Sequence, residues 1–220
     1  MESKQLSRAE ALGFSGCRHA CHVMLYSDTK SRLFGRTPME HIVLMQMRFD
    51  GLLGFPGGLV NPSKETLEAG LIRELLEEIG TEIPVTAEDH VESCFAPGSS
   101  PSSPSSSSLI IHFYVKKIEE EQIREVEKAA ASTAADHGLE VMGMVRVPLY
   151  TLLRGSGLPF FLSHSFIGNA RSQLIRSLLR LGLVAPDRLH QALAHALEMH
   201  ARSAEDLQAA LAFTEVQKRL

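Results

Sequence analysis

A Pro-Gly-Gly turn followed by a helix with closely spaced carboxylates restricts most strongly what this chain can fold into. The segment GFPGGLVNPSKETLEAGLIRELLEEIG runs from Gly54 to Gly80, and Glu74, Glu77 and Glu78 fall within two helical turns of it. Like charges three or four residues apart destabilise a helix by about 0.2–0.5 kcal/mol per pair. Either these carboxylates lie on an ordinary solvated surface, or a positively charged group belongs between them.

The apolar residues of this segment predict a helix over residues 67–79. Leucine and isoleucine at positions 67, 71, 72, 75, 76 and 79 fill one arc of a helix with a period near 3.6. Thr66 suits the N-cap, and Gly80 suits the residue that ends the helix. On this helix the three glutamates lie beside the apolar arc, and Glu78 is closest to its edge. Carboxylates at such a rim are costly unless they are paired or bound to a metal.

Paired glutamates one turn apart on a helix are typical ligands of Mg²⁺ or Mn²⁺, which prefer oxygen donors. Arg73 can reach Glu77 four residues later and hold that carboxylate in place. The preceding Gly57 and Gly58 permit backbone conformations that other residues refuse, so a backbone carbonyl there could be a further ligand. Taken alone, ELLEE fits an ordinary charged helix face, and the GFPGG turn before it favours the metal site.

Composition limits the class of protein. The 220 residues, 44% of them hydrophobic, suffice for one domain with a real core and an extension. A formal net charge of −4 argues against general nucleic-acid coating, so RNA binding would need a local basic patch. Cys17, Cys21 and Cys94 have no zinc-ligand spacing and predict reduced thiols. No signal peptide or membrane span is recognisable, and we expect a soluble cytosolic or nuclear protein.

Strand-like and helix-like patterns alternate along the chain, which predicts an α/β or α+β sandwich. The predicted strands are 22–27, 41–49, 90–96, 109–118 and 141–147, and the predicted helices are 67–79, 119–131 and 166–183. The third and fourth strands form a hairpin whose loop, Pro97–Ser108, is rich in Pro and Ser. After Pro186 we predict one helix to about residue 201 and a second from Ser203, where Asp206 would complete a capping box.

The tail helix carries His190, His195 and His200, which recur every five residues and so share no tight metal-binding face. Leu189, Leu193 and Leu197 form a short apolar stripe instead. Such a stripe predicts that the tail packs on the domain or on a dimer partner.

The glutamate segment resembles the Nudix box of the Nudix hydrolases. The likeness consists of Glu65, seven intervening residues, Arg73-Glu74, two leucines, Glu77-Glu78, Ile79 and Gly80. Two positions depart from the family pattern: six residues instead of five separate Gly58 from Glu65, and Thr81 replaces a usually apolar residue. The resemblance implies an α/β/α sandwich with a mixed sheet, a divalent cation such as Mg²⁺ or Mn²⁺, and attack of water on phosphorus in a nucleoside diphosphate linked to another group.

Longer segments are similar to the U8 snoRNA-decapping branch, which includes enzymes described as inosine diphosphatases. They are RHACHVMLY, LFGR, VLMQMRFDGLLGFPGG, DHGLEVMGMVRVPLYTL and SFIGNARSQL. The likeness covers about residues 15–183, with an insertion at 97–108 and a helical tail at 184–220. It implies hydrolysis of RNA 5′ caps and of inosine-type diphosphates by a homodimer that resides in the nucleoplasm, the nucleolus and the cytoplasm.

The resemblance also implies roles for individual residues in substrate binding. His22 and Arg48 look like contacts to the purine or the phosphates, Phe55 like a ring that stacks on the base, and Gln173 like an amide that reads the base edge. Each has a plainer structural alternative. His22 would be an outward strand histidine, Arg48 a partner in a surface ion pair, Phe55 a core residue and Gln173 a solvated helix residue.

For the metal site, the resemblance implies Glu74, Glu78 and the Gly57 carbonyl as ligands, with Glu77 in support of catalysis. This branch also uses a histidine after the Nudix helix, and the best-matching position here is Cys94. Cysteine is a soft ligand and a poor choice for Mg²⁺. His90 or His112 would then have to substitute, which leaves the number of metals and the substrate preference open.

A different class of function is the alternative hypothesis. A paralogue in this branch, the Tudor-interacting repair regulator (syndesmos), binds RNA and a Tudor-domain partner without catalysis and lacks the box glutamates. The opening KQLSRAEAL and the tail Pro186–Leu220 are more similar to that paralogue than to the enzyme. The intact Arg73-Glu74 and Glu77-Glu78 pairs favour a hydrolase.

Overall fold

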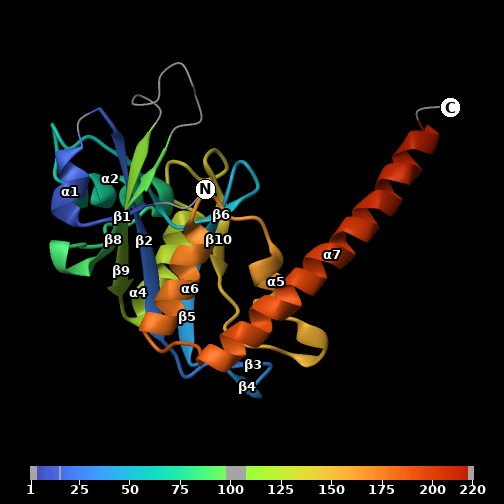
Figure 1. Cartoon of the computed structure of the whole chain (residues 1–220). Helices are drawn as coiled ribbons and strands as arrows, with labels where there is room; N and C mark the ends of the chain where they lie inside the picture. The colour runs from blue at the N-terminus through green and yellow to red at the C-terminus, as the bar shows by residue number, and fades with distance from the viewer. Residues whose placement is uncertain (1–3, 15, 98–107, 218–220) are drawn as a thin grey trace.

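A mixed β-sheet with helices on both faces forms the centre of the computed structural model (Figure 1), which describes residues 4–14, 16–97 and 108–217. The strand order is β1-β8-β9-β2-β5-β10, with β6 paired to β5 and β7 paired to β2. The strands are β1 (Lys4–Leu6), β2 (Arg18–Asp28), β5 (His41–Arg48), β6 (Leu53–Gly54), β7 (Gly57–Val60), β8 (His90–Ala96), β9 (Leu109–Lys117) and β10 (Val141–Arg146). A separate small hairpin consists of β3 (Arg32–Leu33) and β4 (Thr37–Pro38).

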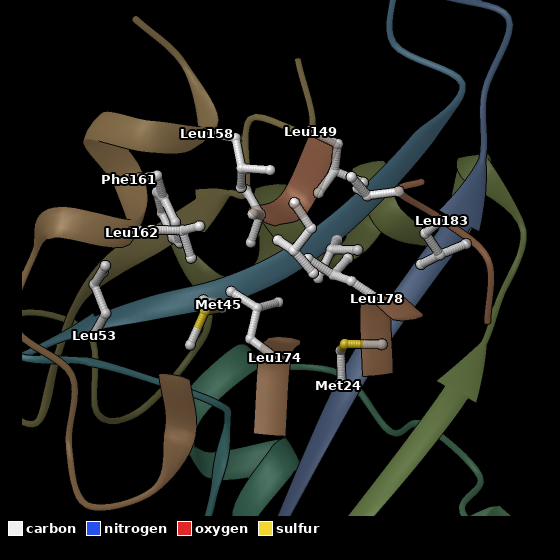
Figure 2. Close-up of a cluster of buried hydrophobic side chains, with 14 of the residues drawn as sticks. Met24, Met45, Leu53, Leu149, Leu158, Phe161, Leu162, Leu174, Leu178 and Leu183 are labelled. Atoms are coloured by element: carbon white, nitrogen blue, oxygen red, sulfur yellow. The ribbon is translucent and has the colours of Figure 1, made fainter. Parts of the chain in front are cut away.

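Two groups of helices cover the two faces of the sheet, and each group packs over its own buried cluster. The helices are α1 (Arg8–Gly13), α2 (Leu67–Ile79), α4 (Glu120–Ala130), α5 (Leu158–Ser163), α6 (Ala170–Arg180) and α7 (Pro186–Gln217), with 3₁₀ turns at Ala87–Asp89 and Leu153–Gly155. Successive residues of β2 point to opposite faces: Val23 packs into the cluster under α2 and α4, and Met24 into the cluster under α5, α6 and α7 (Figure 2). These two buried clusters confirm the predicted α/β sandwich.

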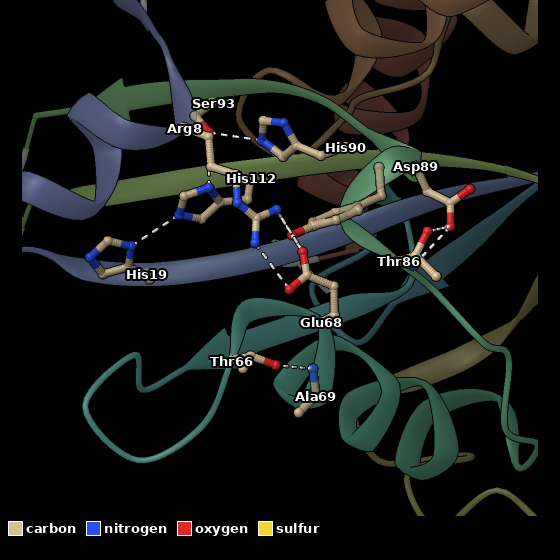
Figure 3. A network of polar contacts seen from close by, with 11 residues as sticks. Arg8, His19, Thr66, Glu68, Ala69, Thr86, Asp89, His90, Ser93 and His112 are labelled. Atoms are coloured by element: carbon tan, nitrogen blue, oxygen red, sulfur yellow. Dashed lines mark hydrogen bonds and ion pairs between the residues drawn. The ribbon is translucent and has the colours of Figure 1, made fainter.

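The helix that carries the glutamates begins and ends as predicted. The Thr66 hydroxyl accepts a hydrogen bond from the Ala69 amide at 3.1 Å, which caps the N-terminus (Figure 3). Gly80 ends the helix in the left-handed conformation at φ 70°, and its N–H donates to the Leu76 carbonyl at 3.1 Å. The buried positions on α2 are Leu67, Gly70, Leu71, Leu75, Glu78 and Ile79. Glu78 is the only charged side chain among them.

The C-terminal tail differs from the prediction. A single helix, α7, runs from Pro186 to Gln217, so the predicted break with a capping box at Ser203 is wrong. The sequence ARSAED holds no Pro or Gly, and a Ser-x-x-acid pattern caps a helix only where the backbone leaves the helical conformation. Among the described residues, no helix is both long and apolar enough to cross a membrane.

The apolar stripe of the tail packs on the domain only in its first part. Leu189, Ala192 and Ala196 are buried in the cluster with α5, and Leu197 is exposed. Beyond this contact the helix leaves the body of the domain (Figure 1), and Leu207 and Leu211 are exposed.

Two other segments differ from the prediction, and a third predicted segment lies outside the described residues. Helix α6 begins at Ala170 instead of residue 166, because Ser165 and Ile167 exchange backbone hydrogen bonds with Leu53 at 2.9 Å each. Strand β1 lies before the predicted domain start at residue 15, yet it pairs antiparallel with β8 and extends the sheet. The predicted Pro/Ser-rich loop coincides with residues 98–107, which lie outside the described residues.

Candidate active site

Glu78 is the most buried carboxylate of α2 and lies at the centre of the candidate site. Only 4% of the residue is exposed. One carboxylate oxygen accepts a hydrogen bond from the Gly57 N–H at 2.6 Å, and the other accepts from the Gln46 Nε2 at 3.0 Å. Charge-assisted hydrogen bonds of this kind fix a carboxylate in position. Glu78 therefore joins α2 to the start of β7 and to the middle of β5.

The two glycines of the turn are both required by the packing. Gly57 has φ 128°, and a Cβ built there would lie 2.1 Å from the Cys21 carbonyl oxygen of β2. A Cβ on Gly58 would lie 2.1 Å from a carboxylate oxygen of Glu74. Since no other residue lacks a Cβ, the Gly-Gly pair lets β7 approach β2 on one side and lets the Glu74 carboxylate lie against the strand on the other.

Arg73 holds the more exposed carboxylates together. Its guanidinium lies 2.7 Å from Glu74, 3.1 Å from Glu65 and 3.5 Å from Glu77. It also donates to the Leu59 carbonyl of β7 at 3.1 Å. The contact to Glu77 confirms the geometry predicted for Arg73, and Glu65 joins the same cluster in spite of its altered spacing from Gly58.

The electrostatics of the site favour an added positive charge. The pKa of the Glu78 carboxyl is raised to about 7, mainly by burial and also by the nearby Glu74, while the Gly57 and Gln46 hydrogen bonds oppose the shift. Burial also raises the pKa of Glu74, against the opposing effect of Arg73. The raised pKa values show that burial disfavours the charged form of both carboxyls, which lie one helical turn apart. A cation between them would stabilise both in the charged form.

The donor set fits the divalent cation that the Nudix resemblance implies. Within residues 4–14, 16–97 and 108–217, no three His, Cys, Asp or Glu side chains converge closely enough to form a complete metal site. Mg²⁺, however, usually takes one or two carboxylates from the protein and completes its shell with water and substrate phosphates. Glu74 and Glu78, one turn apart and partly desolvated, suit that mode, and the role of the Gly57 carbonyl as a further ligand stays a prediction.

The predicted substrate contacts His22 and Arg48 lie next to this cluster. His22 is opposite Gly57 in the β2–β7 pair, and its Nδ1 is a buried atom without a hydrogen-bond partner among the described residues. Burial lowers the pKa of His22 to about 4, so its ring is neutral at pH 7. Arg48 forms an ion pair with Asp50 at 3.2 Å, as its structural alternative predicted, and is still close enough to lower the pKa of both His22 and Glu78.

Phe55 and Gln173 lie on the face of the sheet that α6 covers. Phe55 is only 3% exposed, and its ring packs at 5.0 Å from Phe113, so in this conformation it is a core residue and its ring is closed to a base. Gln173 is buried instead of solvated, and its Nε2 has no hydrogen-bond partner among the described residues. It lines a cavity of about 200 Å³ together with Phe113, Glu92 and Arg176. An unused amide donor at a cavity is consistent with recognition of a polar ligand edge.

The positions considered for the branch's additional histidine ligand have other surroundings in the described part of the chain. Cys94 is buried in β8, two strands away from β2. His112 is fully buried, with its Nε2 3.0 Å from His19 Nδ1 and its Nδ1 2.9 Å from the Ser93 hydroxyl, which in turn lies 2.9 Å from His90 Nε2 (Figure 3). The histidines proposed as substitutes are therefore part of a separate hydrogen-bonded chain.

This histidine chain predicts that acid destabilises the fold. The pKa of His112 is lowered to about 3, mainly by burial and also by the neighbouring His19 and His90. Between the unfolded pKa near 6.5 and the folded value, the unfolded chain binds a proton that the folded chain does not, so stability falls as the pH falls, by at most about 1.4 kcal/mol per pH unit for one histidine. Urea unfolding between pH 7 and pH 4.5 measures this slope.

The matched variants are His112→Gln and His190→Gln. His112→Gln lowers stability at pH 7 but is expected to give a shallower loss with acid than the wild type. His190 is exposed on α7, and its replacement should leave the slope unchanged. Equal slopes for the wild type and His112→Gln would show that His112 does not titrate in this way.

Two residues of the site were not predicted from the sequence. Gln46, which donates to Glu78, stands in the apolar run VLMQM, and a polar residue at an otherwise buried strand position is a signal that could have identified it. Asp136 contributes to the raised pKa of Glu74, and its backbone N–H donates to the Glu77 carbonyl at 3.2 Å. Asp136 lies in the segment that connects α4 and β10, and nothing in the sequence pattern there indicated that it lies near Glu74.

Comparison with known proteins identifies the family of this chain. The family model described as Nudt16-like, U8 snoRNA-decapping enzyme-like, matches residues 19–184. A U8 snoRNA-decapping enzyme of Ovis aries is 51% identical over 185 residues, which cover 83% of this chain and 92% of that protein. A Tudor-interacting repair regulator protein of Homo sapiens is 43% identical over 208 residues, 94% of each chain. The solved Nudix domain of Shewanella oneidensis NrtR, complexed with ADP ribose, is a weaker match: 16% identity, TM-score 0.46, covering 80% of this chain and 99% of that one.

Proposed function

Because the chain belongs to the Nudt16-like, U8 snoRNA-decapping enzyme-like family of Nudix proteins, we propose that it is a metal-dependent hydrolase. Its substrates would be the pyrophosphate linkage of RNA 5′ caps and of inosine-type purine nucleoside diphosphates. The observation that carries this proposal is the buried Glu78 carboxylate, fixed by Gly57 and Gln46 beside Glu74. A buried carboxylate beside a second, partly buried one is costly for the fold, and such arrangements are typical of functional sites.

The roles of the chain's own residues follow from their positions. Glu74 and Glu78 would hold Mg²⁺ or Mn²⁺, which when bound neutralises phosphate oxygens and acidifies nearby water. Glu77, the most exposed of the three, lies 3.5 Å from Arg73 and would accept a proton from the attacking water. Arg48 would bind a phosphate through its guanidinium. The neutral His22 ring and the Gln173 amide would contact the purine.

A substrate panel tests this function directly. Purified protein is assayed with Mg²⁺, with Mn²⁺ and with chelator, on capped RNA and on inosine diphosphate, and Glu78→Gln serves as the inactive reference. Turnover that requires a divalent cation and exceeds that of the reference supports the proposal. Turnover absent for both substrates, or equal to the reference, contradicts it.

Gln173 provides a test of the base-binding side. Replacing it by alanine is expected to raise KM for inosine diphosphate about tenfold with a small change in kcat, since one hydrogen bond to the bound purine is lost. The fold should be little affected, because the Nε2 has no partner among the described residues. Steady-state kinetics measure the effect, and Gln208→Ala, on the exposed part of α7, is the control. A KM equal to that of the control would remove Gln173 from the substrate site.

A second candidate function is an RNA-binding regulator of a Tudor-domain repair protein with little or no catalysis. Its support is the similarity to the human Tudor-interacting repair regulator over 94% of both chains, against 83% of this chain for the sheep decapping enzyme. A pull-down with a tandem Tudor domain, run beside the hydrolysis assay, separates the two candidates. Clear binding without hydrolysis would favour the regulator.

The cellular setting is part of the same proposal and rests on the family resemblance. The protein would reside in the nucleoplasm, the nucleolus and the cytoplasm, and would act as a homodimer. Imaging of the tagged chain tests the first point, and light scattering of the purified protein tests the second. A monomeric mass at micromolar concentration would contradict the dimer.

A further inference from the structure

The β3–β4 hairpin presents an aromatic side chain in an unusual way. Phe34 is 83% exposed, and its backbone has φ 53°, in the left-handed region. The following Gly35 has φ 68°, and two backbone hydrogen bonds close the turn, Gly35 N–H to the Arg32 carbonyl at 3.2 Å and Arg36 N–H to the Leu33 carbonyl at 3.1 Å. The first left-handed position of such turns is normally Asn, Asp or Gly, and a bulky residue is unfavourable there. The backbone strain at Phe34 is thus not offset by burial of its ring, which the hairpin holds in solvent.

Three basic residues lie on the hairpin or directly before it. Lys30, Arg32 and Arg36 are exposed, and within the described part of the chain none of them forms an ion pair. Arg32 donates to the Arg36 carbonyl at 3.2 Å, which keeps its guanidinium at the turn. No acidic residue occurs between Asp28 and Glu40. The hairpin is therefore locally basic in a chain whose formal charge is −4.

The charges that flank the hairpin do not cancel this patch. Asp28 is engaged by Lys117 in a short ion pair and by His41 at 3.0 Å. Glu120, which the Ser31 hydroxyl contacts at 3.3 Å, is paired with Arg124 at 2.8 Å. These two carboxylates already have positively charged partners. Glu40, which borders the hairpin on the other side, is exposed and forms no ion pair among the described residues. It offsets one of the three basic charges, and the hairpin keeps a net positive charge for an anionic ligand.

We propose that the β3–β4 hairpin binds single-stranded RNA, with one base stacked on Phe34 and flanking phosphates on Lys30, Arg32 and Arg36. An exposed aromatic ring bordered by basic side chains is the combination that holds single strands in a manner tolerant of sequence. The choice of RNA rests on the proposed function. An acidic protein segment would satisfy the charges, but it would leave the outward-held ring without a stacking partner.

The position of the hairpin defines which part of an RNA it would hold. It lies at the end of the sheet opposite the β6 turn (Figure 1). His22, beside the catalytic turn, and Asp28, at the start of the hairpin connection, are six residues apart on β2, or about 20 Å. The patch would therefore contact the RNA body at a distance from the reacting 5′ end, and its loss would affect long substrates and spare nucleoside diphosphates.

The absence of tryptophan from the sequence allows a direct test. In the Phe34→Trp variant, combined with Glu78→Gln to prevent hydrolysis, a single-stranded ten-nucleotide RNA without a cap is expected to quench the tryptophan fluorescence at saturation. The same change at Phe160, 45% exposed on α5, is the control and should show no quenching. No quenching at Phe34, or equal quenching at both positions, would overturn the inference. Quenching by a polyglutamate peptide but not by RNA would overturn it in favour of an acidic protein.

Anisotropy with a labelled RNA tests the energetic contributions. Phe34→Ala is expected to weaken binding about tenfold. Arg32→Ala with Arg36→Ala should reduce the slope of log K against log salt by about 1.4, as two phosphate contacts are lost, and Lys128→Ala on α4 should not. Variants that bind like the wild type would overturn the inference. Binding without turnover separates the outcomes, because RNA binding at the hairpin and hydrolysis at Glu78 can each fail alone.

Discussion

Replacing Glu78 by glutamine is expected to reduce the hydrolytic rate by about 10²–10⁴-fold and to leave the fold intact. The negative charge that would bind the cation is removed, while the size and shape of the side chain are retained. Glu78 is buried and shares the site with Glu74, so no exposed carboxylate can move in to replace it without disturbing α2.

The fold can accept the amide for a specific reason. The Gln46 Nε2 now donates to Glu78, and the Gln46 Oε1 is a buried atom without a hydrogen-bond partner among the described residues. After Glu78→Gln, rotation of the Gln46 amide by half a turn would let its Oε1 accept from the new amide group. The Gly57 N–H would still find an oxygen to bond. The variant also removes a charge from a desolvated position, which is favourable for stability.

The measurement is kcat on inosine diphosphate and on capped RNA with Mg²⁺ or Mn²⁺, together with the thermal unfolding midpoint. Glu121→Gln is the matched control, because Glu121 is a largely exposed glutamate on α4. A variant that keeps more than a tenth of the wild-type rate would exclude Glu78 as an essential group. A lowered unfolding midpoint would show that the loss of activity reflects loss of structure.

Gly57→Ala is expected to destabilise the fold by about 3 kcal/mol or more and to abolish activity. At φ 128° an L-residue is strained, and the new Cβ would lie 2.1 Å from the Cys21 carbonyl oxygen and 2.9 Å from the His22 Cα. Both contacts are to backbone, so relief requires β7 to move away from β2. That movement would also withdraw the Gly57 N–H from Glu78.

Gly51→Ala is the control that separates clash from backbone strain. Gly51 also has a positive φ, 78°, but a Cβ there meets no atom within 4 Å. Its replacement should cost only about 1–2 kcal/mol and should preserve activity. Urea unfolding of the two variants gives the comparison. If Gly57→Ala costs no more than Gly51→Ala, the close approach of β7 to β2 has no energetic importance.

The parts of the fold that were predictable from sequence are those with strong local signals. Helix α2 has a sharp apolar period, a threonine cap and a glycine stop, and its observed bounds are those predicted. The β8–β9 hairpin was recognised from two strand patterns around a segment that cannot form a core. Strands β6 and β7 and helix α5 were missed, because each is too short for a period to be visible and depends on tertiary contacts.

The candidate site shows the same division. The glutamates and Arg73 were predictable because they share one helix, whose geometry places them near one another whatever the rest of the chain does. Gln46 was not, because its importance depends on β5 lying beside Glu78, a long-range contact. For Phe55, the sequence left two readings open, a ring that stacks on a base or a core residue. Only the long-range packing against Phe113 shows that it lies in the core.

The edge of the sheet at β1 has a consequence for the tendency of this protein to aggregate. Strand β1 occupies the open side of β8, and Arg8, two residues after it, forms a bidentate contact with Glu68 in the first turn of α2 at 2.6 and 3.0 Å. Without the first eight residues, β8 would offer unpaired backbone groups to other chains, and Glu68 would lose its counter-ion. An unprotected edge strand is a template for aggregation. The segment from Lys4 to Arg8 thus protects β8 against intermolecular strand pairing and also ties the chain to α2.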